Sequence, residues 1–221
     1  MTPETFKSEY GIDARVLHEV EEIDPENRRV LVKDLQSKKG RWEPYDRLLI
    51  ATGAVPFCPK VPGSDAPGIY GLHSLQSGIT VRNVVDTERP RRAVVVGGGY
   101  IGLEMAEALL LRGLEVSLVE RGTQVMNTLD PDMGALVSKA LVEVGINLYL
   151  EESLEAFEAA GGRVTAVVTD RRTLPADLVI LGLGVRPNTA LAQRAGIPLG
   201  VRGAIRVNDR MQTDTPGIWA A

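Results

Sequence analysis

The chain has 221 residues, of which 44% are hydrophobic and 24% charged, as in an ordinary globular protein. Its formal net charge of −4 and the lack of a basic stripe argue against nucleic acid as a partner. One cysteine excludes an internal disulfide framework and a zinc site built on several cysteines. No apolar run reaches the ~18 residues of a membrane span and the start lacks a secretory signal, so we expect a cytoplasmic protein without membrane contact.

The first part of the chain predicts extended structure with little helix. Pro3 opens a short helical turn that ends by Gly11. Extended segments rich in Val, Leu or Ile follow over 14–20, 29–33 and 47–51. The proline- and glycine-rich stretch after residue 53 then predicts a linker or a rigid surface connection.

The middle of the chain alternates strands and helices. Apolar periodicity and turn residues predict helices over 74–87, 100–112 and 131–144, and strands over 92–96, 115–119, 146–150 and 178–183. Gly161-Gly162 predicts a hairpin within a β-meander. This pattern is typical of an α/β protein with a parallel, Rossmann-type sheet. From about residue 200 the chain is short, extended and polar.

A glycine-rich motif follows the strand expected over 92–96. Gly97, Gly99 and Gly102 fit the G-x-G-x-x-G pattern, with Tyr100 and Ile101 between them. Gly97 permits a tight turn, Gly99 lets the backbone approach a pyrophosphate, and Gly102 lets the following helix pack closely. Free N–H groups and the helix dipole favour an anion at this point. The motif, the strand and the helix together predict dinucleotide binding.

An acid, Glu120, lies at the end of the next strand, where it would accept hydrogen bonds from the adenosine ribose. A solvated carboxylate is the alternative interpretation of a charged residue at a strand end. The charge of Glu120 should repel a 2′-phosphate and so favours NADH over NADPH. The neighbouring Arg121 can offset this repulsion, so both forms of NAD(P)H stay open.

Four motifs in the same order resemble the FAD-dependent pyridine nucleotide–disulfide oxidoreductases. They are GGGYIGLEMAE over 97–107, YDRLLIATGA over 45–54, LGLGVRPN over 181–188 and the ending over 215–221. The chain is most similar to the group of CoA-disulfide reductases, NADH oxidases and NADH peroxidases. The resemblance implies an internal fragment with a partial FAD-binding domain over 1–78, an NAD(P)-binding domain over 79–199 and a return segment of the FAD-binding domain over 200–221.

The resemblance also implies a function for the parent enzyme. Hydride would pass from NAD(P)H to FAD and then to a cysteine-based centre that reduces CoA disulfide, persulfide or oxygen species. The parent would be a homodimer, and the fragment alone is expected to be inactive. Two alternatives are a stand-alone NAD(H)-binding regulatory module and a fragment of a ferredoxin-type flavin reductase.

Specific residues receive roles from the same resemblance. Tyr100 would lie over the flavin and yield to the nicotinamide, and Glu104 would lie near the contact between nicotinamide and flavin. A packed aromatic ring and a solvent-facing charge are the alternatives at these two positions. The resemblance further assigns residues that border the cofactors: Gly182 and Gly184 for the nicotinamide, and Val20, Thr52 and Gly53 for FAD.

Part of the family pattern is missing from these residues. The sequence has no first FAD-binding glycine loop, no redox cysteine in the family's position and no dimerisation domain. Cys58 lies between Phe57 and Pro59 without a basic neighbour or helix start to activate it, so we interpret it as an incidental thiol. The two histidines share no ligand spacing, and no metal site is expected.

Overall fold

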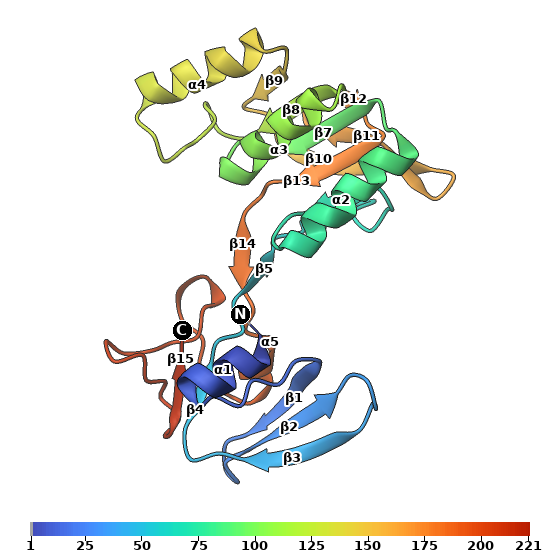
Figure 1. Ribbon diagram of the computed structural model, residues 1–221. Helices are drawn as coiled ribbons and strands as arrows, with labels where there is room; N and C mark the ends of the chain where they lie inside the picture. Colours follow the sequence, from blue (N-terminus) through green and yellow to red (C-terminus); the bar gives the residue numbers. More distant parts are fainter. Residues whose placement is uncertain (1) are drawn as a thin grey trace. The chain divides into compact units, whose positions relative to one another are not determined.

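The structure is a computed structural model that describes residues 2–221, and these form two compact units (Figure 1). The first unit contains the chain up to Ala54 and again from Arg186 onward. The second unit runs from Val55 to Val185. The chain therefore leaves the first unit, builds the second and returns. Strands β5 (Ala54–Pro56) and β14 (Val185–Pro187) mark these two passages.

The first unit combines an antiparallel sheet, a parallel strand pair and short helices. Its elements are α1 (Pro3–Tyr10), β1 (His18–Asp24), β2 (Arg29–Asp34), β3 (Gly40–Pro44), β4 (Leu48–Ile50), α5 (Ala190–Arg194), the 3-10 helix η1 (Val201–Gly203) and β15 (Ile218–Ala220). The antiparallel sheet has the order β1-β2-β3, and β4 pairs in parallel with β15. Ile23, Ile50 and Ile218 belong to its small apolar core. Segments far apart in the sequence therefore share this core.

The second unit is built on a five-stranded parallel sheet with the order β6-β13-β7-β8-β9. These strands are β6 (Ile69–Gly71), β7 (Arg92–Val96), β8 (Glu115–Glu120), β9 (Asn147–Leu150) and β13 (Leu178–Leu181). Three helices accompany them: α2 (Leu75–Glu88), α3 (Tyr100–Leu111) and α4 (Pro131–Glu143). An antiparallel meander consists of β10 (Leu154–Ala160), β11 (Arg163–Thr169) and β12 (Thr173–Pro175). This is the Rossmann-type sheet with a β-meander that the sequence predicts.

Alternate side chains of the central strands pack on opposite faces of this sheet. In β7, Ala93 and Val95 join the core cluster that includes Leu109 of α3. Val94 and Val96 join the cluster that includes Phe157 and Val167 of the meander. A strand covered on both faces needs apolar residues at every position. The apolar run of β7 is therefore explained by its position between the helices on one face and the meander on the other.

The boundaries of most expected elements are confirmed to within a few residues. The main error lies in the first strand, which was expected over 14–20 but runs from His18 to Asp24. Leu17 has a φ of +57°, a left-handed conformation that a strand cannot contain, so the chain turns before β1 begins. Helix α5 was not predicted, because it is too short to show helical periodicity.

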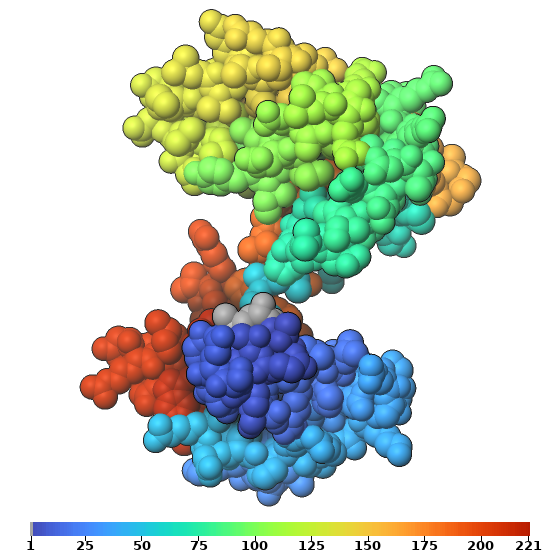
Figure 2. Space-filling view, viewed as in Figure 1, coloured from blue at the N-terminus to red at the C-terminus, as the bar shows by residue number. Residues whose placement is uncertain are grey.

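Helix α4 lies on the surface of the second unit (Figure 2, yellow), and part of its apolar side is exposed. Pro131 occupies its first turn, as expected, although the Asp130 side chain makes no capping hydrogen bond. Leu141 is buried, whereas Leu136 and Val144 are 60% and 59% exposed. The helix packs on β9 and covers only the edge of the sheet.

Asp177 joins the starts of β13 and β7. Its carboxylate accepts hydrogen bonds of 3.0 Å from the backbone N–H groups of Arg91 and Arg92 and from the Arg92 guanidinium. Burial works to raise the pKa of Asp177, but the hydrogen bonds from Arg92 and Arg91 outweigh it and hold the pKa below its ordinary value of 3.8. The charged carboxylate therefore stabilises the folded unit.

Replacing Asp177 by Asn should destabilise the protein by about 1 kcal/mol at pH 7, because the charge-assisted bonds weaken at a partly exposed site. The pKa of Asp177 is lower in the folded than in the unfolded protein, so its charge stabilises the fold when the pH is above the ordinary pKa. This stabilisation is lost as the pH falls through the pKa of the folded protein. Urea unfolding at neutral and acidic pH measures the effect. Asp177→Asn and wild type should converge in acid, and the exposed control Asp65→Asn should match wild type throughout. A difference that persists in acid would contradict this account.

Candidate dinucleotide-binding site

Three glycines touch one another where β7 ends and α3 begins. Gly97 has a φ of +106°, and a Cβ added to it would lie 2.5 Å from the Gly182 carbonyl oxygen. A Cβ on Gly102 would lie 1.9 Å from the Gly97 carbonyl oxygen, and one on Gly182 would lie 3.0 Å from the Cα of Gly102. Packing therefore demands glycine at Gly97 and Gly102, whatever the site binds.

Gly99 differs from these glycines because nothing surrounds its missing side chain. It precedes Tyr100, the first residue of α3, and no side chain caps this helix end. Its φ of −83° suits any residue, and no atom lies within 4 Å of an added Cβ. Packing does not explain a glycine here. An open space at an uncapped helix N-terminus fits an anionic group that approaches the backbone.

Glu120, at the end of β8, binds the glycine turn directly. Its Oε2 accepts a hydrogen bond of 2.7 Å from the Gly98 N–H, and its Oε1 accepts one of 2.6 Å from the Gly122 N–H. The Asn127 side chain donates to the same Oε1 at 3.3 Å. The carboxylate therefore holds the glycine turn and the loop after β8 together. It keeps further lone pairs for a ligand hydroxyl.

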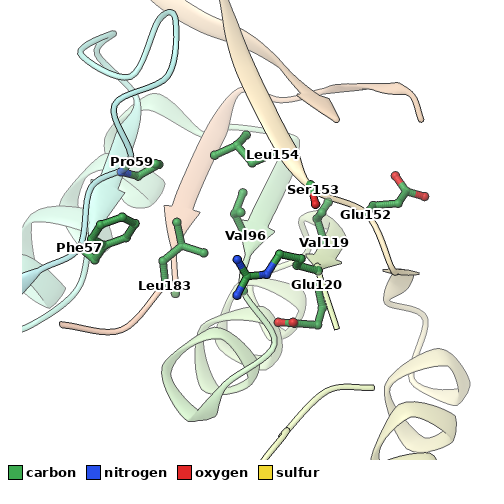
Figure 3. A pocket seen from close by; sticks show the side chains of 12 residues that line it. Phe57, Pro59, Val96, Val119, Glu120, Glu152, Ser153, Leu154 and Leu183 are labelled. Atoms are coloured by element: carbon green, nitrogen blue, oxygen red, sulfur yellow. The ribbon is translucent and has the colours of Figure 1, made fainter. Parts of the chain in front are cut away.

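A pocket of about 450 Å³ opens beside the glycine turn at the carboxyl ends of the strands. Gly97, Glu120 and Gly182 belong to its lining, so the structure brings together these three residues that the sequence assigned to the site. In Figure 3, Phe57 and Pro59 lie on one side of the pocket and Glu152 and Ser153 on the other. Open α/β sheets bind their ligands at this edge.

The other predicted nicotinamide residues lie outside the lining of this pocket. Tyr100 is 66% exposed at the first position of α3, with Ile101 next to it. Glu104 is exposed one turn further along the same helix and lines a separate groove with Leu103 and residues of α4. Gly184 is exposed, with a φ of +80°. Their roles toward the cofactor remain predictions.

Several residues that line the pocket were not predicted as site residues. Arg121 was weighed only as a neighbour of Glu120, and the segment 152–154 was not considered. The signal for this segment was its place directly after β9. Carboxyl ends of neighbouring parallel strands gather at one edge, so residues after β9 lie beside those after β8.

The residues predicted to contact FAD belong to the first unit. Thr52 and Gly53 line a mainly apolar pocket of about 460 Å³ together with Asn188. The Thr52 hydroxyl donates to the Asn188 carbonyl oxygen at 2.6 Å, and the Asn188 N–H donates to the Gly53 carbonyl oxygen at 2.9 Å. Val20 is 38% exposed on β1 and does not line this pocket.

Residues 2–221 contain neither a metal-binding cluster of side chains nor a membrane-spanning helix. No group of three or more His, Cys, Asp or Glu side chains is placed to hold a metal ion in this range. No helix in the same range is long and apolar enough to cross a membrane. Cys58 is a free, exposed thiol.

The fold of the second unit and its glycine turn are those of Rossmann-type nucleotide-binding domains. Comparison with protein families makes the assignment specific, because the family "Pyridine nucleotide-disulphide oxidoreductase" matches residues 3–221. The chain belongs to this family. The resemblance stated from its four motifs is confirmed.

Individual relatives cover almost the whole chain. It is 38% identical over 220 residues to an NADH oxidase of Methanocaldococcus jannaschii, which covers 99% of this chain and 48% of the relative. It is 37% identical to a CoA-dependent NAD(P)H sulfur oxidoreductase of Pyrococcus abyssi, with the same coverage. The crystal structure of reduced Bacillus anthracis CoADR-RHD superposes with a TM-score of 0.92 at 36% identity, covering 100% of this chain and 39% of that one. The chain thus spans about half the length of the curated relatives it matches.

The open space at Gly99 yields a direct test. Gly99→Leu should leave the fold intact, because an added Cβ meets no neighbouring atom and the backbone is unstrained. It should raise the Kd for NADH at least about tenfold by filling the space next to the helix start. Calorimetry measures the binding and thermal unfolding the stability. Gly78→Leu is the matched control, because that position in α2 is also open. Normal NADH binding by Gly99→Leu would refute the role of the turn.

Proposed function

We propose that the second unit binds NAD(P)H, with the pyrophosphate at the start of α3. The observation that carries this proposal is Gly99, which is open although the neighbouring Gly97 and Gly102 are required by packing. The uncapped helix start offers N–H groups to an anion at the same point. The bound NAD(P)H supplies a hydride. The chain orients it through the glycine turn and the walls of the pocket.

At the adenosine end, Glu120 and Arg121 act in opposite directions. Glu120 keeps lone pairs for the ribose hydroxyls and repels a 2′-phosphate. Arg121 lines the same pocket and offers a guanidinium that attracts such a phosphate. We propose a preference for NADH that Arg121 reduces.

At the nicotinamide end, the proposed roles rest on the family. Gly182 and Gly184 leave room for the nicotinamide ring, because neither places a side chain beside it. Tyr100 covers the flavin until the nicotinamide arrives, and Glu104 lies near their contact. The exposure of Tyr100 in the second unit is compatible with such a movable ring.

We further propose that the first unit contributes part of a FAD site through Thr52, Gly53 and Val20. The mainly apolar pocket beside Thr52 and Gly53 supports this role, and Val20 rests on the family resemblance alone. The proposed domains divide the chain at 78/79 and 199/200, whereas the compact units divide it after Ala54 and Val185. The segment 55–78 therefore belongs to the FAD-binding domain in the proposed division, whereas its contacts place it in the second unit.

For the whole protein we propose transfer of hydride from NAD(P)H to FAD and onward to a small-molecule acceptor. The relatives are named as NADH oxidases and as CoA-dependent sulfur reductases, which supports oxygen species or CoA-bound sulfur as acceptors. A homodimer is proposed from the family resemblance. The 221-residue chain covers about half of the length of these relatives, so we expect it to bind NADH without catalysing the reaction.

Calorimetry of the 221-residue chain with NADH, and separately with FAD, tests this division of roles. We expect NADH to bind and FAD to bind weakly, because the pocket at Thr52 offers only part of a flavin site. Absence of NADH binding would overturn the proposed function. Tight retention of FAD would show that the flavin site is complete within this chain and contradict the proposed division.

Charge substitutions at the adenosine end should change the ratio of Kd for NADPH to Kd for NADH. Glu120→Gln removes the negative charge and also one of the two bonds from a backbone N–H, because the amide nitrogen cannot accept. A loss common to both ligands cancels in the ratio, so the ratio should fall about tenfold, whereas Arg121→Gln should raise it by a similar factor. Glu115→Gln, at the other end of β8, is the matched control and should leave the ratio unchanged. Fluorescence titration measures both constants. Equal ratios in all three variants would remove Glu120 and Arg121 from the site.

A further inference from the structure

Glu152 and Thr169 are the buried polar side chains among the described residues, and they bind each other. They are 2% and 4% exposed. The Thr169 hydroxyl donates to Oε2 of Glu152 at 2.9 Å. A carboxylate is expensive to bury unless it is paired, so its presence in this core calls for an explanation beyond packing.

A second partner neutralises the Glu152 carboxylate. Its Oε1 lies 2.9 Å from a guanidinium nitrogen of Arg172, whose guanidinium stacks 4.5 Å from the centre of the Tyr149 ring. Thr169 in turn accepts hydrogen bonds of 3.2 and 3.0 Å from the N–H groups of Arg171 and Arg172. The turn over 169–172, between β11 and β12, thus holds both oxygens of Glu152.

The backbone around Glu152 binds the end of β8 and the turn over 169–172. The Glu151 N–H donates to the Gly122 carbonyl oxygen at 3.0 Å, and the Glu152 N–H donates to the Glu120 carbonyl oxygen at 3.2 Å. The Ser153 N–H donates to the Asp170 carboxylate at 2.8 Å. The segment 151–153 is therefore held between the end of β8 and the turn over 169–172.

This segment needs such support because its backbone is strained. Glu151 has a φ of +54°, in the left-handed region that side chains other than glycine disfavour. In Figure 3 the Glu152 carboxylate points away from Val96 and Leu183, although Glu152 and Ser153 line the pocket. Glu152 thus influences the pocket through its own backbone, without pointing its charge into it.

We propose that Glu152 is a positioning residue for the adenosine end of the dinucleotide. By binding Thr169 and Arg172, it fixes the segment 151–153, which carries one wall of the pocket, and through this segment the backbone of Glu120 and Gly122. Glu120 also holds the glycine turn, so the same network reaches the proposed pyrophosphate site. This inference rests on the proposed binding of NAD(P)H.

The test compares ligands that do and do not reach this wall. Calorimetry of the 221-residue chain would use ADP-ribose, which contains the adenosine end, and nicotinamide mononucleotide, which lacks it. Glu152→Gln and Thr169→Val should each raise the Kd for ADP-ribose about tenfold and leave that for the mononucleotide unchanged. Thr169→Ser keeps the hydroxyl and should restore binding. Glu158→Gln, an exposed acid on β10, is the matched control.

Binding is measured well below the unfolding temperature of every variant, and the unfolding temperature itself is measured in parallel. A lower unfolding temperature with an unchanged Kd for ADP-ribose would show a purely structural role and overturn the proposal. Equal losses for both ligands would also overturn it. If wild type binds neither ADP-ribose nor NADH, the proposed function itself fails, and the inference fails with it.

Discussion

The contact between Gly97, Gly102 and Gly182 is the constraint on which the rest of the second unit depends. At this point the ends of β7 and β13 and the start of α3 approach so closely that a Cβ would collide with backbone atoms. The close approach brings the helix start to the carboxyl edge of the sheet, where Glu120 closes the turn. A single steric requirement thus sets the place of the pocket and the direction of the helix dipole that faces it.

Much of this unit could be predicted from the sequence because its signals are local. The strand β7 reads as an unbroken apolar run since both of its faces are covered, and Pro131 marks the start of α4. The glycine motif predicted the turn because Gly97 and Gly102 meet nearby steric demands, whereas Gly99 faces open space. Glu120 was predicted as a ligand for ribose, and the structure adds its hydrogen bonds to Gly98 and Gly122, which no motif encodes.

The remaining features depend on contacts between distant residues. The start of β1 was misplaced because the left-handed turn at Leu17 leaves no trace in an apolar pattern. The support of the pocket wall by Thr169 and Arg172 could not be predicted, because these residues are distant in sequence from Glu152. Residues such as Tyr100 and Glu104 received roles only from the resemblance, and their exposure in the second unit does not by itself reveal chemistry.

In each unit, hydrogen bonds join the two chain segments at the point where the chain passes from one unit to the other. In the second unit, the Phe57 N–H donates to the Gly184 carbonyl oxygen at 2.9 Å, and in the first, Asn188 binds Thr52 and Gly53. The segments by which the chain enters and leaves each unit are therefore neighbours. The two ends of the folded insert lie as close together as the ends of a short loop, although the insert is long. Because the two junctions lie side by side in space, another folded domain with neighbouring ends fits between them without distorting the host, so this architecture suits the evolutionary exchange of whole domains.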